Sequence, residues 1–312
     1  MRLFHRSALI LCAAAVLVSA EKGCPYPEDV EPCTCTETGD YVSLGCRRVD
    51  DTEVLRRVFD NSRRYHFNEF VLRQSTLQYI PHEVFDDVRV KSLVLMNVTL
   101  RNMFDKAPTD PDLMHLSVLE VKILAGWDWK KLADFKNVEY LTIWDTLLKR
   151  LPADFRSNVS KKLRRLSLRN CNIKKLQDDV FADLTDVEKF DLGNNAIVDI
   201  KRTMFPRRTK VKMLNLIYNK ISTVPSDMFS DMPFLVDVSL RGNMMAVLPE
   251  ATFQPIISQL FYLNVEENPI KCDCLMAWVL EERRDRISGK CYAPKALRDK
   301  PFDRLTRRDI RC

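Results

Sequence analysis

The sequence predicts an α/β solenoid in which each repeat adds one strand to a long parallel sheet. One pattern, LxxLxLxxN, recurs five times between Leu163 and Asn268. Eight cysteines gather in two clusters, one near each end of the chain. A repeating unit of this kind cannot bury its apolar edge alone, so neighbouring units must stack and the two ends must be closed by atypical caps. The fourth position of the pattern recurs at a nearly constant spacing, at Leu166, Phe190, Leu214, Val238 and Leu263.

This consensus is that of the leucine-rich repeat. The likeness implies a right-handed horseshoe with the parallel sheet on its concave face. The same phase continues toward the N-terminus with less regular steps, which gives nine repeats, each roughly 22–26 residues long. The earlier fourth positions are Phe70, Leu93, Leu119 and Leu141.

The residue types within a repeat follow from its geometry. Positions four and six are apolar and alternate with polar residues, as a half-buried strand requires. The ninth position turns the chain, and an asparagine there can satisfy the backbone groups of adjacent turns. Early repeats carry Ser75, Val98, Leu124, Thr146 and Cys171 instead of Asn195, Asn219, Asn243 and Asn268. Serine, threonine and cysteine can partly replace asparagine, whereas valine and leucine cannot, so we expect those two turns to be built differently. A phenylalanine in the later part of most repeats predicts an apolar spine on the convex side, at Phe85, Phe155, Phe181, Phe205, Phe229 and Phe253.

The N-terminal segment 1–20 is typical of a secretory signal peptide. Arg2 and Arg6 precede an apolar stretch from Ser7 to Val18, and Ala20 ends a small-residue cleavage site. This stretch is shorter than the roughly 20 residues that cross a membrane, and no other long apolar run follows. We therefore expect a secreted, extracellular protein without a membrane anchor, organised as signal peptide 1–20, N-terminal cap 21–64, repeats 65–268 and C-terminal cap 269–312.

The clustered cysteines predict disulfides rather than metal sites, because a secreted chain oxidises its thiols and no histidine stands at ligand spacing. Four cysteines allow three pairings, and spacing alone does not choose among them. Both clusters resemble the caps of extracellular leucine-rich repeat proteins. That resemblance implies the bonds Cys24–Cys35, Cys33–Cys46, Cys272–Cys291 and Cys274–Cys312. Cys171 stands apart at a ladder position, which favours a buried structural thiol over an intermolecular disulfide.

The sequence offers little for catalysis. After signal-peptide removal three histidines remain, His66, His82 and His115, and they fall in different repeats. HExxH and GxSxG are absent, and the seven glycines form no phosphate-binding loop. We expect no enzyme activity, no cofactor, no metal site and no nucleic-acid binding.

Binding of an extracellular protein has better support. Equivalent positions of successive strands form columns on the concave face, which is the usual binding surface of a solenoid. Two of these columns and the residue beside one of them carry exposed aromatic, arginine and apolar side chains of the kind that anchor protein interfaces. The alternative is a solvated strand face with chance aromatics. The candidate binding residues are Tyr140, Trp144, Arg165, Arg169, Met213, Ile217, Tyr218, Arg241 and Tyr262.

Two further features bear on the binding surface. The sequons at Asn97 and Asn158 predict N-linked glycans, and a glycan on Asn97 would mask the second repeat and direct a partner to later ones. The stretch 283–312 has eleven basic and four acidic residues, so Arg304, Arg307 and Arg308 could bind a glycosaminoglycan, although a solvated cap is the simpler interpretation.

The N-terminal motif CPYPEDVEPCTCT resembles arthropod proteins similar to the non-catalytic subunit of secreted shrimp luciferase. The resemblance implies a non-enzymatic, partner-binding or stabilising subunit. Three functions follow: a secreted protein-binding module acting through its concave face, a stabilising subunit of a secreted enzyme, or an extracellular-matrix binder acting through the basic C-terminal cap.

Overall fold

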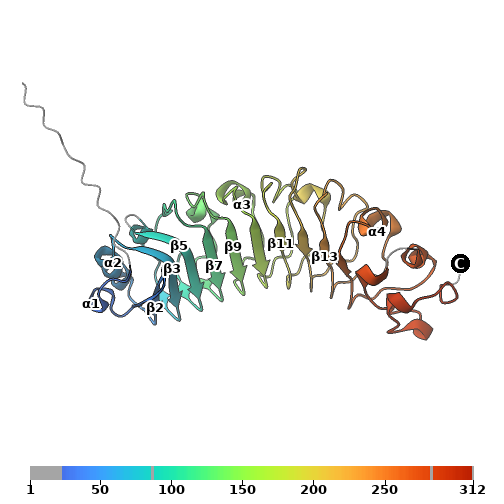
Figure 1. Cartoon of the computed structure of the whole chain (residues 1–312), viewed down its shortest axis with the longest axis horizontal. Coiled ribbons are helices and arrows are strands. Elements are labelled where there is room, and N and C mark those ends of the chain that lie inside the picture. The colour runs from blue at the N-terminus through green and yellow to red at the C-terminus, as the bar shows by residue number, and fades with distance from the viewer. Residues whose placement is uncertain (1–22, 86–87, 282–283, 311–312) are drawn as a thin grey trace, which may run out of the picture.

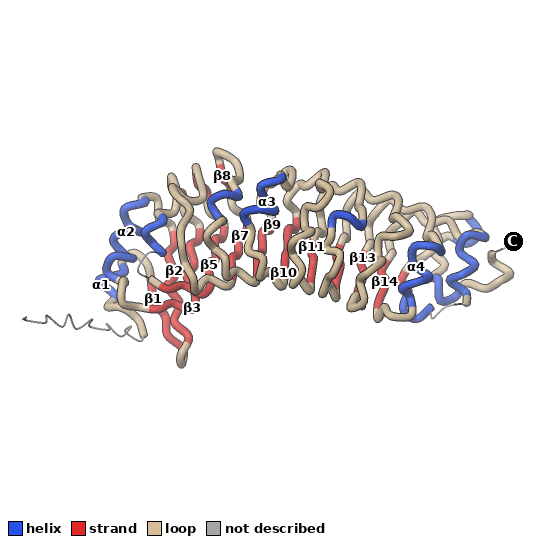
Figure 2. Tube along the Cα trace, turned by 90° about the horizontal axis from the view of Figure 1, so that it is seen from above, coloured by secondary structure: helices blue, strands red, loops and turns tan. Residues whose placement is uncertain are grey.

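The computed structural model describes residues 23–85, 88–281 and 284–310. They form an elongated, gently curved stack in which strands lie side by side along the whole length (Figure 1). The main sheet has twelve strands in chain order, with β1 antiparallel to β2 and every other pair parallel. Seen from above in Figure 2, the strands lie side by side between loops, with α2 and α3 along one border. The predicted solenoid is confirmed.

The strands belong to two sheets. The main sheet contains β1 (Thr34–Thr38), β2 (Tyr41–Arg47), β3 (His66–Arg73), β5 (Arg89–Met96), β7 (His115–Leu119), β9 (Tyr140–Trp144), β10 (Arg165–Arg169), β11 (Lys189–Asp191), β12 (Met213–Asn215), β13 (Asp237–Ser239), β14 (Tyr262–Asn264) and β15 (Ile287–Ser288). A second, smaller sheet contains β4 (Thr76–Leu77), β6 (Thr99–Leu100) and β8 (Lys122–Ile123).

The helices are short. The α-helices are α1 (Pro27–Val30), α2 (Thr52–Asn61), α3 (Ala153–Asn158) and α4 (Glu250–Ile257). The 3-10 helices are η1 (His82–Phe85), η2 (Trp129–Leu132), η3 (Arg202–Met204), η4 (Cys274–Leu280), η5 (Arg284–Arg286), η6 (Lys295–Leu297) and η7 (Phe302–Arg304).

The strand register corrects the phase of the third repeat. Leu93 pairs with Leu116, and Leu116 pairs with Leu141, so Leu116 occupies the fourth position. The prediction of Leu119 at this position was wrong, because Leu119 pairs with Met96 and lies at the seventh position. With this correction the early repeats are as regular in length as the later ones. The fourth positions of the nine expected repeat strands are Phe70, Leu93, Leu116, Leu141, Leu166, Phe190, Leu214, Val238 and Leu263.

The core lies between the sheet and the outer connections. The predicted spine is confirmed, since all six of its phenylalanines are buried. Where the third repeat lacks one, Trp129 fills the space, with its ring 4.7 Å from that of Phe155 in an edge-on arrangement. Aromatic pairs in this geometry stabilise a core beyond the area they bury.

The ninth-position asparagines form the expected ladder. Asn219 Oδ1 accepts from the Ile197 N–H at 3.0 Å, while its Nδ2 donates to the Leu192 and Leu216 carbonyls. Cys171 makes similar connections through sulfur, because its thiol donates to the Ile143 and Arg169 carbonyls at 3.2 Å. Ser75 and Thr146 accept the corresponding backbone N–H groups. All three residues therefore replace asparagine in part, as expected.

The remaining early turns are built differently, as expected, though at Val98 and Val121 rather than at Val98 and Leu124. The corrected phase puts Val121 at the ninth position, and both valines are buried. Here the backbone pairs directly with the adjacent turn: the Thr99 N–H donates to the Ser75 carbonyl and the Lys122 N–H to the Val98 carbonyl, both at 2.9 Å. These bonds form the small sheet β4–β6–β8, which supplies the hydrogen bonds that a valine side chain cannot.

Disulfides close the ends. The structure contains Cys24–Cys35, Cys33–Cys46 and Cys272–Cys291, with S–S distances of 1.98, 2.03 and 2.00 Å. The expected bond between Cys274 and Cys312 involves a residue outside the described ones, and the predicted signal peptide also lies outside them. In the C-terminal cap Trp278 is buried and donates from Nε1 to the Leu248 carbonyl at 3.1 Å, which covers the last repeat.

Candidate functional site

All nine candidate binding residues lie on one surface, the concave face of the main sheet. The register places Tyr140, Arg165, Met213 and Tyr262 in one column at the third position of their repeats, together with Lys189 and Asp237. Trp144 and Arg169 pair in a second column at the seventh position, which Ile217 and Arg241 continue beyond the short later strands. Tyr218 lies beside Ile217. None of the nine is buried.

Three of the aromatic side chains on this face, those of Tyr140, Trp144 and Tyr218, are paired with arginines of the following repeat. The Arg165 guanidinium lies 5.6 Å from the Tyr140 ring centroid, that of Arg169 lies 5.5 Å from Trp144, and that of Arg241 lies 5.8 Å from Tyr218. These separations are within the range of cation–π attraction. The sequence indicated both residue types, and the structure brings them together in three composite units.

Trp144 is further held by a hydrogen bond. Its Nε1 donates to Ser167 Oγ at 2.7 Å, so the ring is orientated although the side chain is 37% exposed. An ordered, exposed indole loses little conformational entropy when a partner covers it, which favours its use as an anchor.

The eighth position adopts left-handed backbone in ten successive turns. The residues with positive φ are Arg48, Gln74, Asn97, Glu120, Asp145, Asn170, Asn194, Tyr218, Gly242 and Glu267. Glycine and asparagine tolerate this conformation, whereas a bulky residue such as Tyr218, at φ +50°, is strained. Tyr218 shares this conformation with Arg48, Gln74 and Glu120, so it is a property of the repeat.

The Tyr218 ring belongs to a small network. Arg241 hydrogen-bonds Glu267 through both Nε and Nη2, and it also lies against the ring. The pKa of the Glu267 carboxyl is lowered by its hydrogen bond with Arg241 and by a second one with Tyr218. The side chains of two repeats therefore support the exposed ring.

Sequence reasoning missed His115 and Leu119 on this face because the third repeat was out of phase, and it did not single out Met96 of the second repeat. His115, at the third position, stacks on Tyr140 with centroids 4.5 Å apart and planes 4° from parallel. Met96, Leu119 and Trp144 form a row at the seventh position. The candidate surface therefore extends into repeats that the sequence pattern left out.

The two sequons lie in different surroundings. Asn97 is exposed at the left-handed eighth position beside Met96, on the border of the concave face. Asn158 is half-buried at the end of α3, where its Nδ2 donates to the Asp154 carbonyl at 2.7 Å, and the Ser160 hydroxyl is bound to the Lys136 carbonyl. Glycans on Asn97 and Asn158 remain predictions, and the Asn158 Nδ2 that would carry one uses a single hydrogen in its bond with the Asp154 carbonyl.

The basic residues of the C-terminal cap are partly neutralised. Arg307 lies 2.9 Å from the Glu281 carboxylate, and both side chains are exposed. Arg304 and Arg308 are exposed and form no ion pair with any residue that the structure describes. All three candidate polyanion-binding arginines are thus exposed, and only Arg307 is paired with a carboxylate of the described residues.

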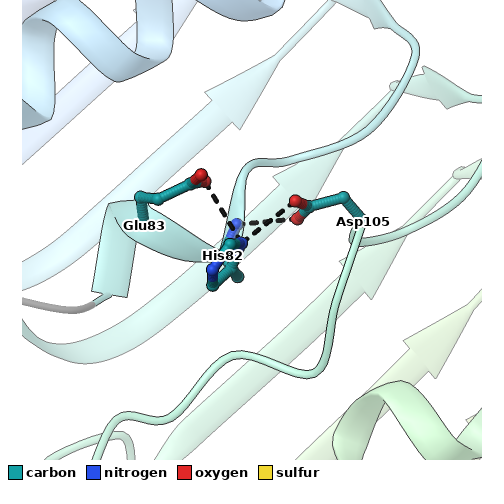
Figure 3. Close-up of side chains that lie close together, drawn as sticks. All are labelled: His82, Glu83 and Asp105. Carbon is teal, nitrogen blue, oxygen red and sulfur yellow. Dashed lines mark hydrogen bonds and ion pairs between the residues drawn. The ribbon is translucent and has the colours of Figure 1, made fainter.

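Figure 3 shows a cluster of His82, Glu83 and Asp105 at the junction of the first two repeats. His82 Nδ1 is 3.0 Å from Asp105 Oδ2 and 3.2 Å from Glu83 Oε2, and the His82 N–H donates to Asp105 Oδ1. Burial alone would raise the pKa of Asp105, but backbone hydrogen bonds from His82 and Lys106 lower it. Arg56 also lies 3.8 Å from Glu83, and the bonds between His82 and Asp105 link the turns of the first two repeats.

Within the described residues, no helix is long and apolar enough to cross a membrane.

Comparisons with known proteins support the fold. The family described as "Leucine rich repeat" matches residues 161–207 and 185–245. The chain is 22% identical to the non-catalytic subunit of Oplophorus-luciferin 2-monooxygenase from Oplophorus gracilirostris, over 93% of this chain and 92% of that one. It is 29% identical to mouse Toll-like receptor 9 over 45% of this chain, but this covers only 14% of the receptor.

Similarity to solved structures also supports the leucine-rich repeat fold. A chain in the octameric complex of Latrophilin 3, Unc5D and FLRT2 superposes with a TM-score of 0.64 at 17% identity, covering 91% of this chain and 98% of that one. The TLR13–ssRNA13 complex matches with a TM-score of 0.61 at 21% identity, over 71% of this chain and 31% of that one. With its repeats, its parallel sheet and its disulfide-bonded ends, the chain is a leucine-rich repeat protein.

Proposed function

We propose that this chain is an extracellular, non-catalytic protein-binding module whose partner docks on the concave face between Tyr140 and Tyr262. The three aromatic–arginine units carry the proposal. Tryptophan, tyrosine and arginine dominate the binding energy of protein interfaces, and here they are ordered before any partner arrives. Leucine-rich repeats form a family of protein-binding modules, and the concave face is where a solenoid presents its widest continuous surface.

The chain is further proposed to act as one subunit of a larger complex. The observation that favours this is the likeness to the luciferase non-catalytic subunit, which extends over nearly the full length of both chains. In this case the partner would be a secreted enzyme that the module stabilises. An activity that co-purifies with the chain from native secretions, and is lost when the two are dissociated, would distinguish a stabilising subunit from a binding module with another partner.

The docking surface is tested by cross-linking and substitution. Cross-linking with mass spectrometry on native secretions identifies the partner, and its affinity is then measured for Trp144→Ala and Tyr218→Ala. We expect each variant to bind at least about tenfold more weakly, as loss of an interface anchor usually causes. Leu275→Ala is the matched control, because Leu275 is 60% exposed in the C-terminal cap, away from the sheet. Unchanged affinity in both test variants would refute the concave site.

A further inference from the structure

We propose that the concave face holds an acidic side chain of its protein partner between Arg165 and Lys189. This rests on the proposed function and adds the chemistry of the partner. It arises from a pair of like charges that the fold places together and that form no ion pair with any carboxylate of the described residues.

Arg165 and Lys189 occupy directly opposite positions on neighbouring strands. They pair in the parallel register of β10 and β11, both at the third position of their repeats. Neighbouring strands lie about 4.8 Å apart, and side chains at equivalent positions point to the same face. Like charges in directly opposite positions destabilise a sheet.

No carboxylate within the described residues forms an ion pair with either cation. The nearest acidic group in the sequence, Glu188, lies 2.7 Å from Lys212 and 3.6 Å from Arg164, so its charge is already shared. Arg165 lies over the Tyr140 ring, which attracts a cation without neutralising it. Asp237, two strands away in the same column, attracts Lys189 but forms no ion pair with it. Both cations can therefore still form an ion pair with an incoming anion.

The surface around the pair is hollowed. The hollow is lined by Tyr140, Arg164, Arg165, Glu188, Lys189, Lys212 and Met213, which are four cations, one carboxylate and two largely apolar side chains. An aspartate or glutamate entering it would receive charge-assisted hydrogen bonds from Arg165 and Lys189. Its methylene groups would lie against Tyr140 and Met213.

The neighbouring residues favour a single acidic side chain over a sulfated polysaccharide. In the same column His115 and Tyr140 lie on one side of the cations, and Met213 and Asp237 lie on the other. A polysaccharide with charges at every sugar would meet aromatic rings and a carboxylate within two strands. A protein segment can place one acidic residue among apolar ones, which matches the column.

The like-charge pair is tested first without a ligand. Lys189→Glu would replace a repulsive pair by an attractive one, and we expect the melting temperature to rise by about 1–3 °C at low salt, with the gain lost at high salt. Lys189→Gln, which only removes the repulsion, should give a smaller rise. A fall in melting temperature for both variants would show that Lys189 is already stabilised where it stands, and would overturn the proposal.

The anion site is tested with a fluorescently labelled peptide that carries one glutamate among apolar residues, and its binding is followed by anisotropy. The double variant Arg165→Gln/Lys189→Gln should bind it about tenfold more weakly than the natural chain. The matched control, Lys174→Gln/Lys175→Gln, removes two adjacent exposed cations elsewhere and should stay within about twofold, as expected of solvated surface charges.

Two results would overturn the site: equal weakening in both double variants, or no effect in either. A third result would also overturn the proposal: a heparin octasaccharide binds more tightly than the peptide, and the Arg165→Gln/Lys189→Gln variant loses this affinity. The partner would then be a polysaccharide and not a protein. The proposed function and this inference can fail separately. If the peptide does not bind as expected but a partner still cross-links near Trp144, the inference is wrong and the proposed function stands.

Discussion

Gly242 lies directly beneath the ring of Tyr218. A Cβ atom built on Gly242 would come within 2.3 Å of Tyr218 Cδ1, and the glycine has φ +67°. The exposed Tyr218 ring therefore packs against the backbone of Gly242. A Cβ atom at position 242 would displace the ring.

We expect Gly242→Ala to lower the free energy of unfolding by about 2–3 kcal/mol, because it adds a clash with Tyr218 to the cost of left-handed backbone. Gly39→Ala is the control: Gly39 has φ +60°, and no atom lies within 4 Å of its added Cβ. It should lose only about 1 kcal/mol. Urea unfolding measures both, and equal losses would contradict the close approach.

The sequence could predict the scaffold but not every detail of its face. In the stretch HLSVLEV, residues 116, 118, 119 and 121 are all apolar, so two phases three positions apart satisfy the repeat pattern equally well. Only pairing with the adjacent strands selects Leu116, and that choice moves Leu119 from the core to the surface. The phase error also concealed the stacking of His115 on Tyr140.

The left-handed eighth position escaped prediction for another reason. It is held by the backbone N–H, which bonds the carbonyl of the next repeat, as from Tyr218 to Arg241 at 2.7 Å. Arginine, glutamate, aspartate and tyrosine all occupy the position, so residue type gives no signal. The cation–π pairs were also hidden from the sequence, because they join residues of successive repeats that lie at matching positions. Those positions can be matched only when the length of each repeat is known.

We expect the Cys171 thiol to be unreactive in the folded protein. Burial raises the pKa of its thiol to about 12, and reactive cysteines need the thiolate. We expect no difference between the natural chain and Cys171→Ala in labelling by a disulfide reagent at pH 8. One extra equivalent should appear for the natural chain in urea. A disulfide-linked dimer on non-reducing gels that disappears in Cys171→Ala would contradict the structural role.

Arg202 should be a large contributor to stability. It is 9% exposed, and its guanidinium donates to the carbonyls of Ser230, Phe205, Pro206 and Arg207. Removing a donor from buried acceptors costs about 1–3 kcal/mol, so Arg202→Met should lower the free energy of unfolding by at least that amount.

The exposed Arg207 provides the control for this substitution. Arg207→Met should change stability by less than about 0.5 kcal/mol, as surface substitutions usually do. Similar losses in the two variants would show that the carbonyls around Arg202 are satisfied in another way.

Asp110 should give the protein a stability that rises on mild acidification. The residue is fully buried and accepts hydrogen bonds from the Val90 and Asp112 N–H groups. Burial outweighs these bonds and raises the pKa of its carboxyl to about 6.

Because the folded state binds this proton more tightly than the unfolded state, the contribution of Asp110 to stability increases as pH falls from 7 to 5, by about 1 kcal/mol. The matched variant Asp110→Asn cannot titrate. Comparing the pH dependence of unfolding for the two chains isolates the effect, since other groups titrate in both. Parallel profiles between pH 5 and 7 would exclude it.

The strands of the main sheet shorten along the chain, from five to eight residues in β3, β5, β7, β9 and β10 to three residues in β11 to β14, and only the early repeats have the second sheet β4–β6–β8. In the later repeats the strand ladder is therefore shorter, and turn bonds such as that from the Leu192 N–H to the Asn215 carbonyl carry part of the link between repeats. In a stack where each repeat contacts only its neighbours, local opening begins where those links are weakest. We therefore expect the amide hydrogens of the half that carries Tyr218 and Tyr262 to exchange first. A partner bound there would slow this exchange by stabilising those repeats against local opening.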